Sequence, residues 1–378
     1  MAVRHHRAPA STPAPAKPAM GYQPGLDGLR AIAVLAVVAF HYRAPLPGGW
    51  LGVNLFFVIS GYLITRLLME EQARHGGIHL RSFYRRRAAR LLPAMYLIVG
   101  VFLVISLFVP SPNHLADVRG AVTGWLYMAN IDRYFGQSNG GMFGHLWSLS
   151  LEEQFYACWP LVVTIIHRKG RAQQTGRIAA AASAGLFALL VVRALWWFNL
   201  DQLYNGIEGQ GMACLLLGCA WGAARSTRQW PALLTIASAV IVVVAACVMP
   251  YDSPASFVLL PLVALAMLVL VNASLRGGIL APLMGNPVLQ HLGRLSYGIY
   301  LIHSCVRLVL VRGFGGPLSP AWTIAAAAIT LALAELSYRG FEQPLRRRLS
   351  RDRPPSALSA SGDLTFDQVA AHGHAPSR

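Results

Sequence analysis

The sequence predicts an all-α integral membrane protein, built as a bundle of about ten transmembrane helices. Hydrophobic residues make up 55% of its 378 residues and charged residues only 12%, against about 25% charged residues in ordinary soluble domains. Long apolar runs recur from Leu26 to Tyr338, and the mean hydropathy is +0.48. A chain that crosses lipid this often must satisfy its backbone hydrogen bonds internally, which helices do. The five cysteines lie in apolar runs without metal-ligand spacing, so we interpret them as small apolar residues.

Ten apolar segments are long enough, or nearly so, to cross a bilayer as helices. They lie at 26–42, 50–69, 91–109, 145–166, 178–198, 210–224, 231–249, 256–273, 295–312 and 320–339, of which 145–166 and 210–224 are the least apolar. The segment Leu115–Ile131 is also apolar, but it contains Asp117 and Arg119. We expect this segment to be an interfacial or re-entrant piece on the outer side of the membrane.

The distribution of basic residues predicts the orientation of these spans. Ten crossings with a cytoplasmic N-terminus put the most basic loops on the cytoplasmic side, at Arg81–Arg90, His167–Arg177, Arg225–Arg228, Arg276–Arg294 and Arg346–Arg353. The opposite loops carry almost no Lys or Arg, as the positive-inside rule requires. We therefore expect a multi-pass protein of the cytoplasmic (inner) membrane with both termini cytoplasmic. The net charge of +17 follows from this topology, and we expect no nucleic-acid partner.

The two ends of the chain differ in composition from its apolar middle. Residues 1–20 are rich in Ala and Pro, and residues 346–378 are polar and rich in Pro and Ser, so we expect two disordered cytoplasmic tails. Residues 21–345 are expected to form the single membrane domain. A basic lead before an apolar run can also be a signal peptide, but no clear small-residue cleavage site follows here, and we expect the first span to be retained.

The first span carries two polar residues on one stripe. Arg30 and His41 are eleven residues apart, which places them on one helix face about 16 Å apart along the axis. Ionisable residues inside a membrane are costly and usually mark a site or a pathway. The alternative is an arginine that anchors the helix end and an interfacial histidine.

Glu152 is predicted to reach a depth similar to that of His41 from another span. The segment from His145 to Tyr156 runs from outside to inside, so Glu152 lies about 10 Å below His145. A carboxylate beside an imidazole supplies a general base with an orienting partner. The alternative is a structural ion pair that joins two helices.

Further polar residues lie in or near the other spans. Arg87 and Arg90 share a helix face at the cytoplasmic end of the third span, and arginine forks suit phosphate; topogenic charge is the alternative. In the second span, Asn54, Ser60 and Gly61 are read first as residues that let helices pack closely. No P-loop, Gly-x-Ser-x-Gly elbow or His-Glu-x-x-His motif occurs, and we expect no metal.

Six of these pieces together resemble the acyltransferase-3 family of polytopic membrane O-acyltransferases. They occur in the family's order and cover nearly the whole chain: Leu26-Asp-Gly-Leu-Arg30 with His41, Leu55-Phe-Phe-Val-Ile-Ser-Gly-Tyr-Leu63, Arg87-x-x-Arg90, Trp147-Ser-Leu-Ser-Leu-Glu-Glu-Gln-Phe-Tyr156, Leu295-Ser-Tyr-Gly-Ile-Tyr-Leu-Ile-His303 and Phe341-Glu-Gln-Pro344. Some members carry a fused esterase-like domain after the last span. The tail here is too short for one, and we expect a stand-alone member.

The resemblance implies transfer of an acyl group, commonly acetyl, from acyl-CoA to a hydroxyl of a surface polysaccharide, peptidoglycan, lipid-linked glycan or glycosylated metabolite such as a macrolide. It implies that His41 and Glu152 are catalytic and that Arg30, Arg87 and Arg90 bind the donor. Substrate-binding or structural support falls to Asp27, Asn54, Ser60, Trp147, Gln154, Tyr156, Tyr297 and His303. Many members carry aspartate at the position of Asn54, so its role here is open.

Two mechanisms and two other functions remain open from the sequence. His41, oriented by Glu152, could act as a general base in direct transfer, or His41 could carry the acyl group as a nucleophile. The alternatives are a proton-coupled transporter or flippase for a glycan or lipid-linked sugar, and a structural subunit of a polysaccharide export complex. The expected partners are the lipid bilayer, acyl-CoA and a carbohydrate or glycoside acceptor; the oligomeric state, including a homo-oligomer, is open.

Overall fold

The computed structural model describes residues 22–135, 140–168, 174–196, 206–224, 229–251 and 253–345, and within these ranges it contains helices and no strands. The all-α prediction is therefore confirmed for the described chain. The two predicted tails, 1–20 and 346–378, lie outside the described residues.

Each of the ten predicted spans coincides with a helix. These helices are α1 (Pro24–His41), α2 (Leu51–His75), α3 (Leu80–Phe108), α6 (Trp147–Arg168), α7 (Gln174–Trp196), α8 (Gly206–Ala224), α9 (Ala232–Val248), α10 (Pro254–Leu275), α12 (Pro287–Gly313) and α13 (Pro320–Ser337). The shorter elements are α4 (His114–Trp125), α5 (Ala129–Phe135), the 3₁₀-helix η1 (Gly141–Leu146), α11 (Ala281–Met284) and the π-helix η3 (Tyr338–Glu342).

Six of the described helices are long and apolar enough to cross a membrane: α1, α2, α3, α10, α12 and α13 with its continuation to Leu345. Residues Gln210–Ala224 of α8 and the whole of α9 are shorter apolar helices. The chain is thus a multi-pass membrane protein. Ten crossings and two cytoplasmic termini stay predictions.

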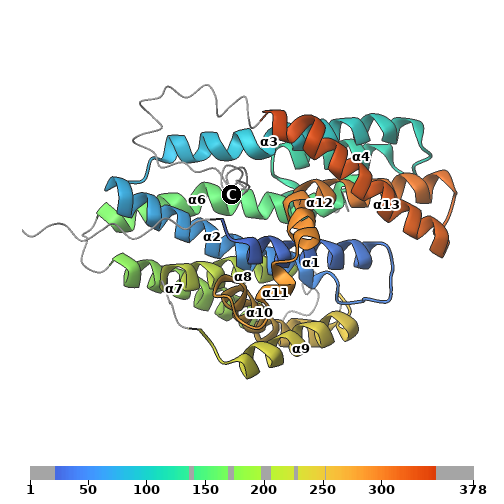
Figure 1. Ribbon diagram of the computed structural model, residues 1–378. Helices are drawn as coiled ribbons and strands as arrows, with labels where there is room; N and C mark the ends of the chain where they lie inside the picture. Colours follow the sequence, from blue (N-terminus) through green and yellow to red (C-terminus); the bar gives the residue numbers. More distant parts are fainter. Residues whose placement is uncertain are drawn as a thin grey trace, which may run out of the picture.

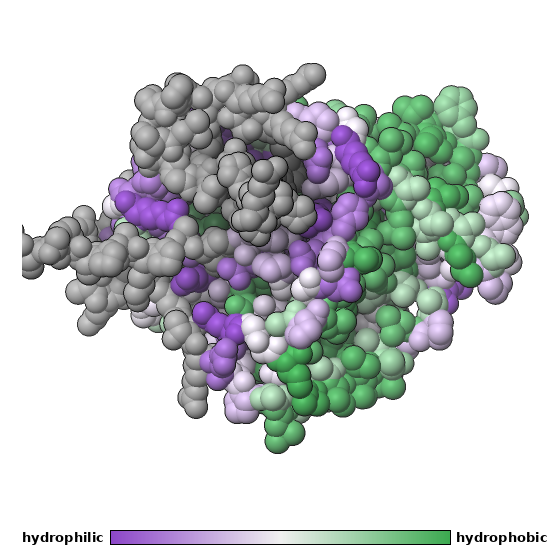
Figure 2. All heavy atoms as spheres, in the orientation of Figure 1, coloured by the Kyte–Doolittle hydropathy of each residue, from purple (hydrophilic) through white to green (hydrophobic). Residues whose placement is uncertain are grey.

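The long helices lie side by side in one bundle (Figure 1). Their outward-facing side chains form a broad apolar band, and hydrophilic residues gather beside this band, toward the left of the view (Figure 2). This pattern is the one expected of a helix bundle surrounded by lipid.

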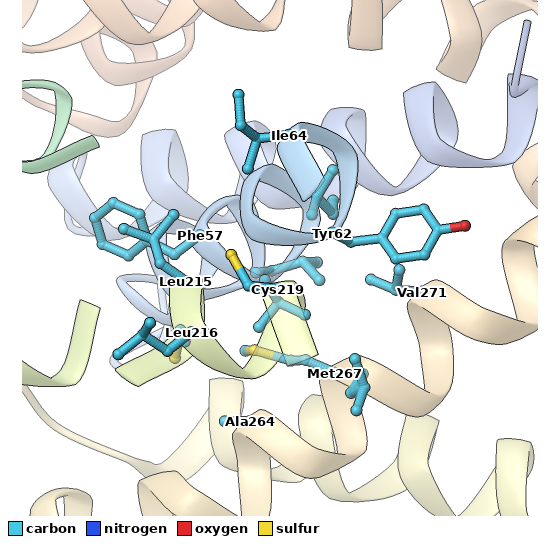
Figure 3. Packing of buried hydrophobic residues seen from close by; sticks show 14 of the residues in the cluster. Phe57, Tyr62, Ile64, Leu215, Leu216, Cys219, Ala264, Met267 and Val271 are labelled. Atoms are coloured by element: carbon cyan, nitrogen blue, oxygen red, sulfur yellow. The ribbon is translucent and has the colours of Figure 1, made fainter. Parts of the chain in front are cut away.

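The centre of one half of the bundle is the close contact of α2 with α8. Phe57 and Tyr62 of α2 pack around Leu215 and Cys219 of α8, next to Met267 of α10 (Figure 3). A Cβ atom on Gly61 would collide with the carbonyl oxygen of Leu215. The packing interpretation of Gly61 is therefore confirmed, because only a residue without a side chain allows this approach.

Helix α1 runs beside α12, with the N-terminal ends of both helices together. A Cβ atom on Gly293 would meet the carbonyl oxygen of Asp27, so the two backbones touch there. At the other end of α1, the Tyr42 hydroxyl donates to the carbonyl oxygen of His303 at 3.0 Å and lies 2.7 Å from Thr330 Oγ1. These contacts place the end of α1 at the middle of α12.

The segment between α3 and α6 is folded into short pieces. Helix α4 has 12 residues, about 18 Å of helix, which is too short to cross the hydrocarbon core. Its Asp117 accepts hydrogen bonds from the Met142 backbone N–H at 2.7 Å and from Arg312 at 2.6 and 3.0 Å. Asp117 thus ties α4 to η1 and to the C-terminal end of α12, and so fixes the start of α6.

Candidate active site

Three histidines from three elements form a row inside the bundle. His41 is the last residue of α1, His303 lies in the middle of α12 and is 0% exposed, and His145 lies in η1. The ring of His303 is 4.8 Å from that of His41 and 5.2 Å from that of His145, centroid to centroid, with edge-to-face geometry in both pairs. Helix–helix packing alone brings these residues together, because they are far apart in the sequence.

The hydrogen bonds fix which ring nitrogens carry protons. His303 Nδ1 lies 2.7 Å from the carbonyl oxygen of Tyr300, which can only accept, so Nδ1 is the protonated atom and Nε2 has the lone pair. His41 Nδ1 lies 3.0 Å from the carbonyl oxygen of Val37 and 3.2 Å from His303 Nε2. Both neighbours are acceptors, so His41 is protonated at Nδ1. The lone pair of neutral His41 is therefore on Nε2, in the form of a general base.

A second set of hydrogen bonds holds the row in place. The Tyr300 hydroxyl donates to the carbonyl oxygen of His145 at 2.9 Å and lies 2.6 Å from Ser148 Oγ. His145 Nε2 lies 3.2 Å from the carbonyl oxygen of Leu301, so this nitrogen is the donor. These bonds join η1 and the start of α6 to α12.

The expected pairing of His41 with Glu152 is wrong in this structure. Within the described residues, the hydrogen-bond partners of His41 are Val37 and His303. Glu152 Oε1 instead accepts from Ser60 Oγ at 2.6 Å and lies 3.9 Å from Arg87 Nη2. The reason is the level along the helix: Glu152 lies four residues, about 6 Å, after Ser148 on the same face of α6, where its side chain meets Ser60 of α2 and Arg87 of α3.

Arg87 is bound by an internal carboxylate. Its Nε lies 3.1 and 2.9 Å from the two oxygens of Glu153, and its Nη2 lies 2.5 Å from Oε1. Its guanidinium also stacks over the ring of Tyr156, 3.3 Å from the ring centroid. A planar, bidentate and stacked arginine of this kind is held firmly in place. Arg90, one turn further along α3, is exposed.

Two predicted residues lie at the N-terminal end of α1. Asp27 Oδ2 accepts from the Tyr22 hydroxyl at 2.9 Å, and Asp27 Oδ1 lies 4.0 Å from Arg30 Nη1. Arg294 Nη1 donates to the same Tyr22 hydroxyl at 3.3 Å. The structure thus adds Tyr22 and Arg294 to the neighbourhood of the predicted Asp27 and Arg30.

The remaining predicted residues have structural contacts in the bundle. Asn54 Nδ2 lies 3.6 Å from Cys214 Sγ, and the ring of Trp147 lies edge-on to Phe57. Gln154 exchanges two hydrogen bonds with Asn130, at 3.0 and 2.9 Å. The Tyr297 hydroxyl donates to the carbonyl oxygen of Leu91 on α3 at 3.0 Å.

Sequence reasoning missed His145 and Glu153 as parts of these clusters, although both lie within or directly before the Trp147–Tyr156 motif. The two consecutive glutamates, Glu152 and Glu153, indicate that two neighbouring faces of this helix carry a carboxylate. No group of three or more His, Cys, Asp or Glu side chains with metal-binding geometry is found among the described residues.

Comparison with known proteins agrees with this set of motifs. Residues 23–339 match the acyltransferase domain of the acyltransferase-3 family. The chain belongs to this family. It is 32% identical over 359 residues to the O-acetyltransferase OatA of Staphylococcus aureus strain NCTC 8325 / PS 47, and equally to OatA of strain COL.

These matches cover 86% of this chain and 58% of each OatA protein. A relative from Staphylococcus aureus strain MSSA476 is 32% identical over 351 residues, which are 87% of this chain and 58% of that protein. The chain thus spans less than two thirds of the length of these relatives. No solved structure matches it.

Proposed function

We propose that this acyltransferase-3 chain is a membrane-bound O-acyltransferase of the cytoplasmic membrane. The donor is acyl-CoA, with acetyl-CoA as the first to test, and the acceptor is a hydroxyl of a carbohydrate or glycoside. The observation that carries the proposal is the protonation pattern of His41: the Nδ1–H is bound by Val37 and His303, so Nε2 is available as a base.

In the proposed reaction, His41 Nε2 accepts the proton of the acceptor hydroxyl while that oxygen attacks the thioester carbonyl. The C–S bond breaks, the acyl group moves to the oxygen, and CoA leaves as a thiol after it receives the proton from His41. A positioned base contributes typically about 10²–10⁴ in rate. His303 is a positioning residue here, because its Nε2 accepts the Nδ1–H of His41 and stabilises the imidazolium.

Glu152 supports the histidine row indirectly in this mechanism. It follows Ser148 by one turn of α6, and Ser148 contacts Tyr300 of the histidine row. Its contacts with Ser60 and Arg87 hold this part of α6 against α2 and α3, and so help to fix the position of Ser148.

The donor is proposed to enter between the basic ends of α1, α3 and α12, where Arg30 and Arg90 lie. Arg87 could contact a phosphate only if it separated from Glu153, so we propose that it braces α3 against α6 instead.

A second candidate function is a proton-coupled transporter or flippase for a glycan or lipid-linked sugar. The specific observation in its favour is the continuous row of His41, His303 and His145, which resembles a proton relay across helices. This function predicts substrate movement without consumption of acyl-CoA.

The test is release of free CoA from acetyl-CoA by the purified full chain in detergent, with and without a panel of glycan and glycoside acceptors. We expect acceptor-dependent release that falls about 10²-fold or more in His41→Ala. Donor binding should be unchanged in this variant. Release that is equal in wild type and His41→Ala contradicts the proposed mechanism, and transport of a glycan without CoA release supports the transporter.

A further inference from the structure

We propose that Tyr22, Arg30 and Arg294 form a phosphate-binding site at the joined N-terminal ends of α1 and α12. The ligand class is an organic phosphate. This inference deepens the proposed function, on which it rests for one source of the phosphate, the CoA part of the acyl donor. An anionic lipid headgroup is the other source of the same chemistry.

The cluster carries more positive than negative charge. Within the described residues, Arg294 has no carboxylate within ion-pair distance, and its hydrogen bond goes to the neutral Tyr22 hydroxyl. Arg30 has a carboxylate neighbour only at 4.0 Å, the limit for an ion pair, and that carboxylate, Asp27, already accepts a hydrogen bond from Tyr22. Two guanidinium groups thus face one carboxylate.

The guanidinium of Arg294 is held less firmly than that of Arg87. Three nitrogen–oxygen contacts of 3.1 Å or less join Arg87 to Glu153, and Tyr156 covers its flat face. A phosphate at Arg87 would have to displace a bidentate carboxylate. A phosphate at Arg294 displaces only the weaker contact to Tyr22 at 3.3 Å. Anion binding is therefore cheaper at Arg294.

The position of Arg294 on α12 brings it toward α3. Tyr297 lies three residues later on the same face of α12 and donates to the carbonyl oxygen of Leu91 on α3. Arg294 therefore lies on the side of α12 that faces the basic segment of α3 ending at Arg90. Both Arg30 and Arg294 are half-buried, so they are accessible to a ligand and partly shielded from water, which strengthens a charged hydrogen bond.

Tyr22 contacts Arg294 directly and is linked to Arg30 through Asp27. Burial, together with the charge of Asp27 and the hydrogen bond to it, raises the pKa of Tyr22 to about 12. Its hydroxyl thus stays neutral at physiological pH and can donate to a phosphate oxygen in place of Asp27. By the predicted topology this site opens to the cytoplasm, the side that holds CoA.

The experiment measures CoA binding to the purified, delipidated full chain in detergent by calorimetry. We expect Arg294→Gln and Arg30→Gln each to raise the Kd for CoA about tenfold or more, the usual effect of losing a charged hydrogen bond. The matched control is Arg81→Gln, which removes one exposed positive charge at the start of α3 and should stay within about twofold. Arg294→Lys, which keeps the charge, should restore part of the affinity and shows that the site is folded. Pantetheine, which lacks the phosphates, should bind wild type and Arg294→Gln equally.

A second arm measures thermal stabilisation by phosphatidylglycerol added to the same samples. If Arg294→Gln and Arg30→Gln lose this stabilisation but keep their CoA affinity, the site is supported and the lipid is its ligand. If both CoA affinity and lipid stabilisation are unchanged in both variants, the site is overturned. Loss of the proposed function has a different signature: wild type that binds no CoA at all, or CoA release that does not depend on His41.

Discussion

Nδ1 of His41 lies 3.2 Å from Nε2 of His303, although 262 residues separate them in the chain. Because His303 Nδ1–H donates to a carbonyl oxygen, neutral His303 can only accept at Nε2, and the hydrogen bond between the two rings therefore runs from His41 to His303. The basic nitrogen of His41 is then Nε2, which takes no part in the hydrogen bonds to His303 and Val37.

Replacing His303 by Phe keeps a ring in the core but removes the acceptor for His41 Nδ1–H. We expect kcat for acceptor-dependent CoA release to fall about tenfold or more, because the imidazolium form of His41 loses a hydrogen bond. KM for the donor should change little. His303→Gln is the matched variant, since its side-chain oxygen can occupy the position of Nε2, and it should recover part of kcat. Equal loss in both variants would mean that His303 only fills space.

Glu152→Gln should reduce kcat by less than His41→Ala, by about tenfold or less. The reason is that Glu152 contacts Ser60 and Arg87, whereas the hydrogen-bond partners of His41 among the described residues are Val37 and His303. The measurement is kcat of both variants in the same CoA-release assay, with Ser60→Ala as the control for the lost hydrogen bond. A loss as large as that of His41→Ala would place Glu152 at the reacting atoms.

Glu153→Gln should lower the thermal stability and leave the Kd for CoA within about twofold of wild type. The expected destabilisation follows from breaking a bidentate, stacked ion pair and leaving Arg87 without its carboxylate. Calorimetric CoA titration and a thermal melt of the same sample check both parts. Tighter CoA binding in Glu153→Gln would show that the released Arg87 takes the phosphate, against the site at Arg294.

Asp117→Asn should destabilise the protein by about 3–5 kcal/mol, the usual cost of leaving one partner of a buried ion pair. Asp117 is 0% exposed, and the side chain of its partner Arg312 is 12% exposed. The measurement is chemical or thermal unfolding in detergent at neutral pH, with Ser111→Ala as a control that removes only the weaker hydrogen bond at 3.2 Å.

Because Asp117 is ionisable, the stability of the protein should also depend on pH. Burial raises the pKa of Asp117, but the hydrogen bonds from Arg312, Met142 and Ser111 and the charge of Arg312 outweigh it and hold the pKa below its ordinary value. A lowered folded-state pKa adds stability that is complete above the unfolded pKa of about 3.9 and is lost as the pH falls through the folded value. Wild type should therefore lose stability below about pH 4, and Asp117→Asn should lose less over the same interval. Parallel curves would contradict the assignment.

The sequence predicted most of the fold because helix formation in a membrane is a local property. Lipid offers the backbone no water to hydrogen-bond with, so an apolar run in the membrane forms a helix, which satisfies its own hydrogen bonds. Each of the ten predicted segments is a helix. It could not predict that the end of α1 would lie at the middle of α12. That placement depends on glycines such as Gly293, which let two particular backbones touch.

By itself, the sequence determined the all-α class, the positions of the helices, the membership of the acyltransferase-3 family and the choice of His41 as the candidate base. Only the tertiary structure decided the partners: His303 for His41, Ser60 for Glu152 and Glu153 for Arg87. The physical reason is that the periodicity of a helix fixes which residues share a face. Which other helix that face meets is decided by packing between segments far apart in the chain.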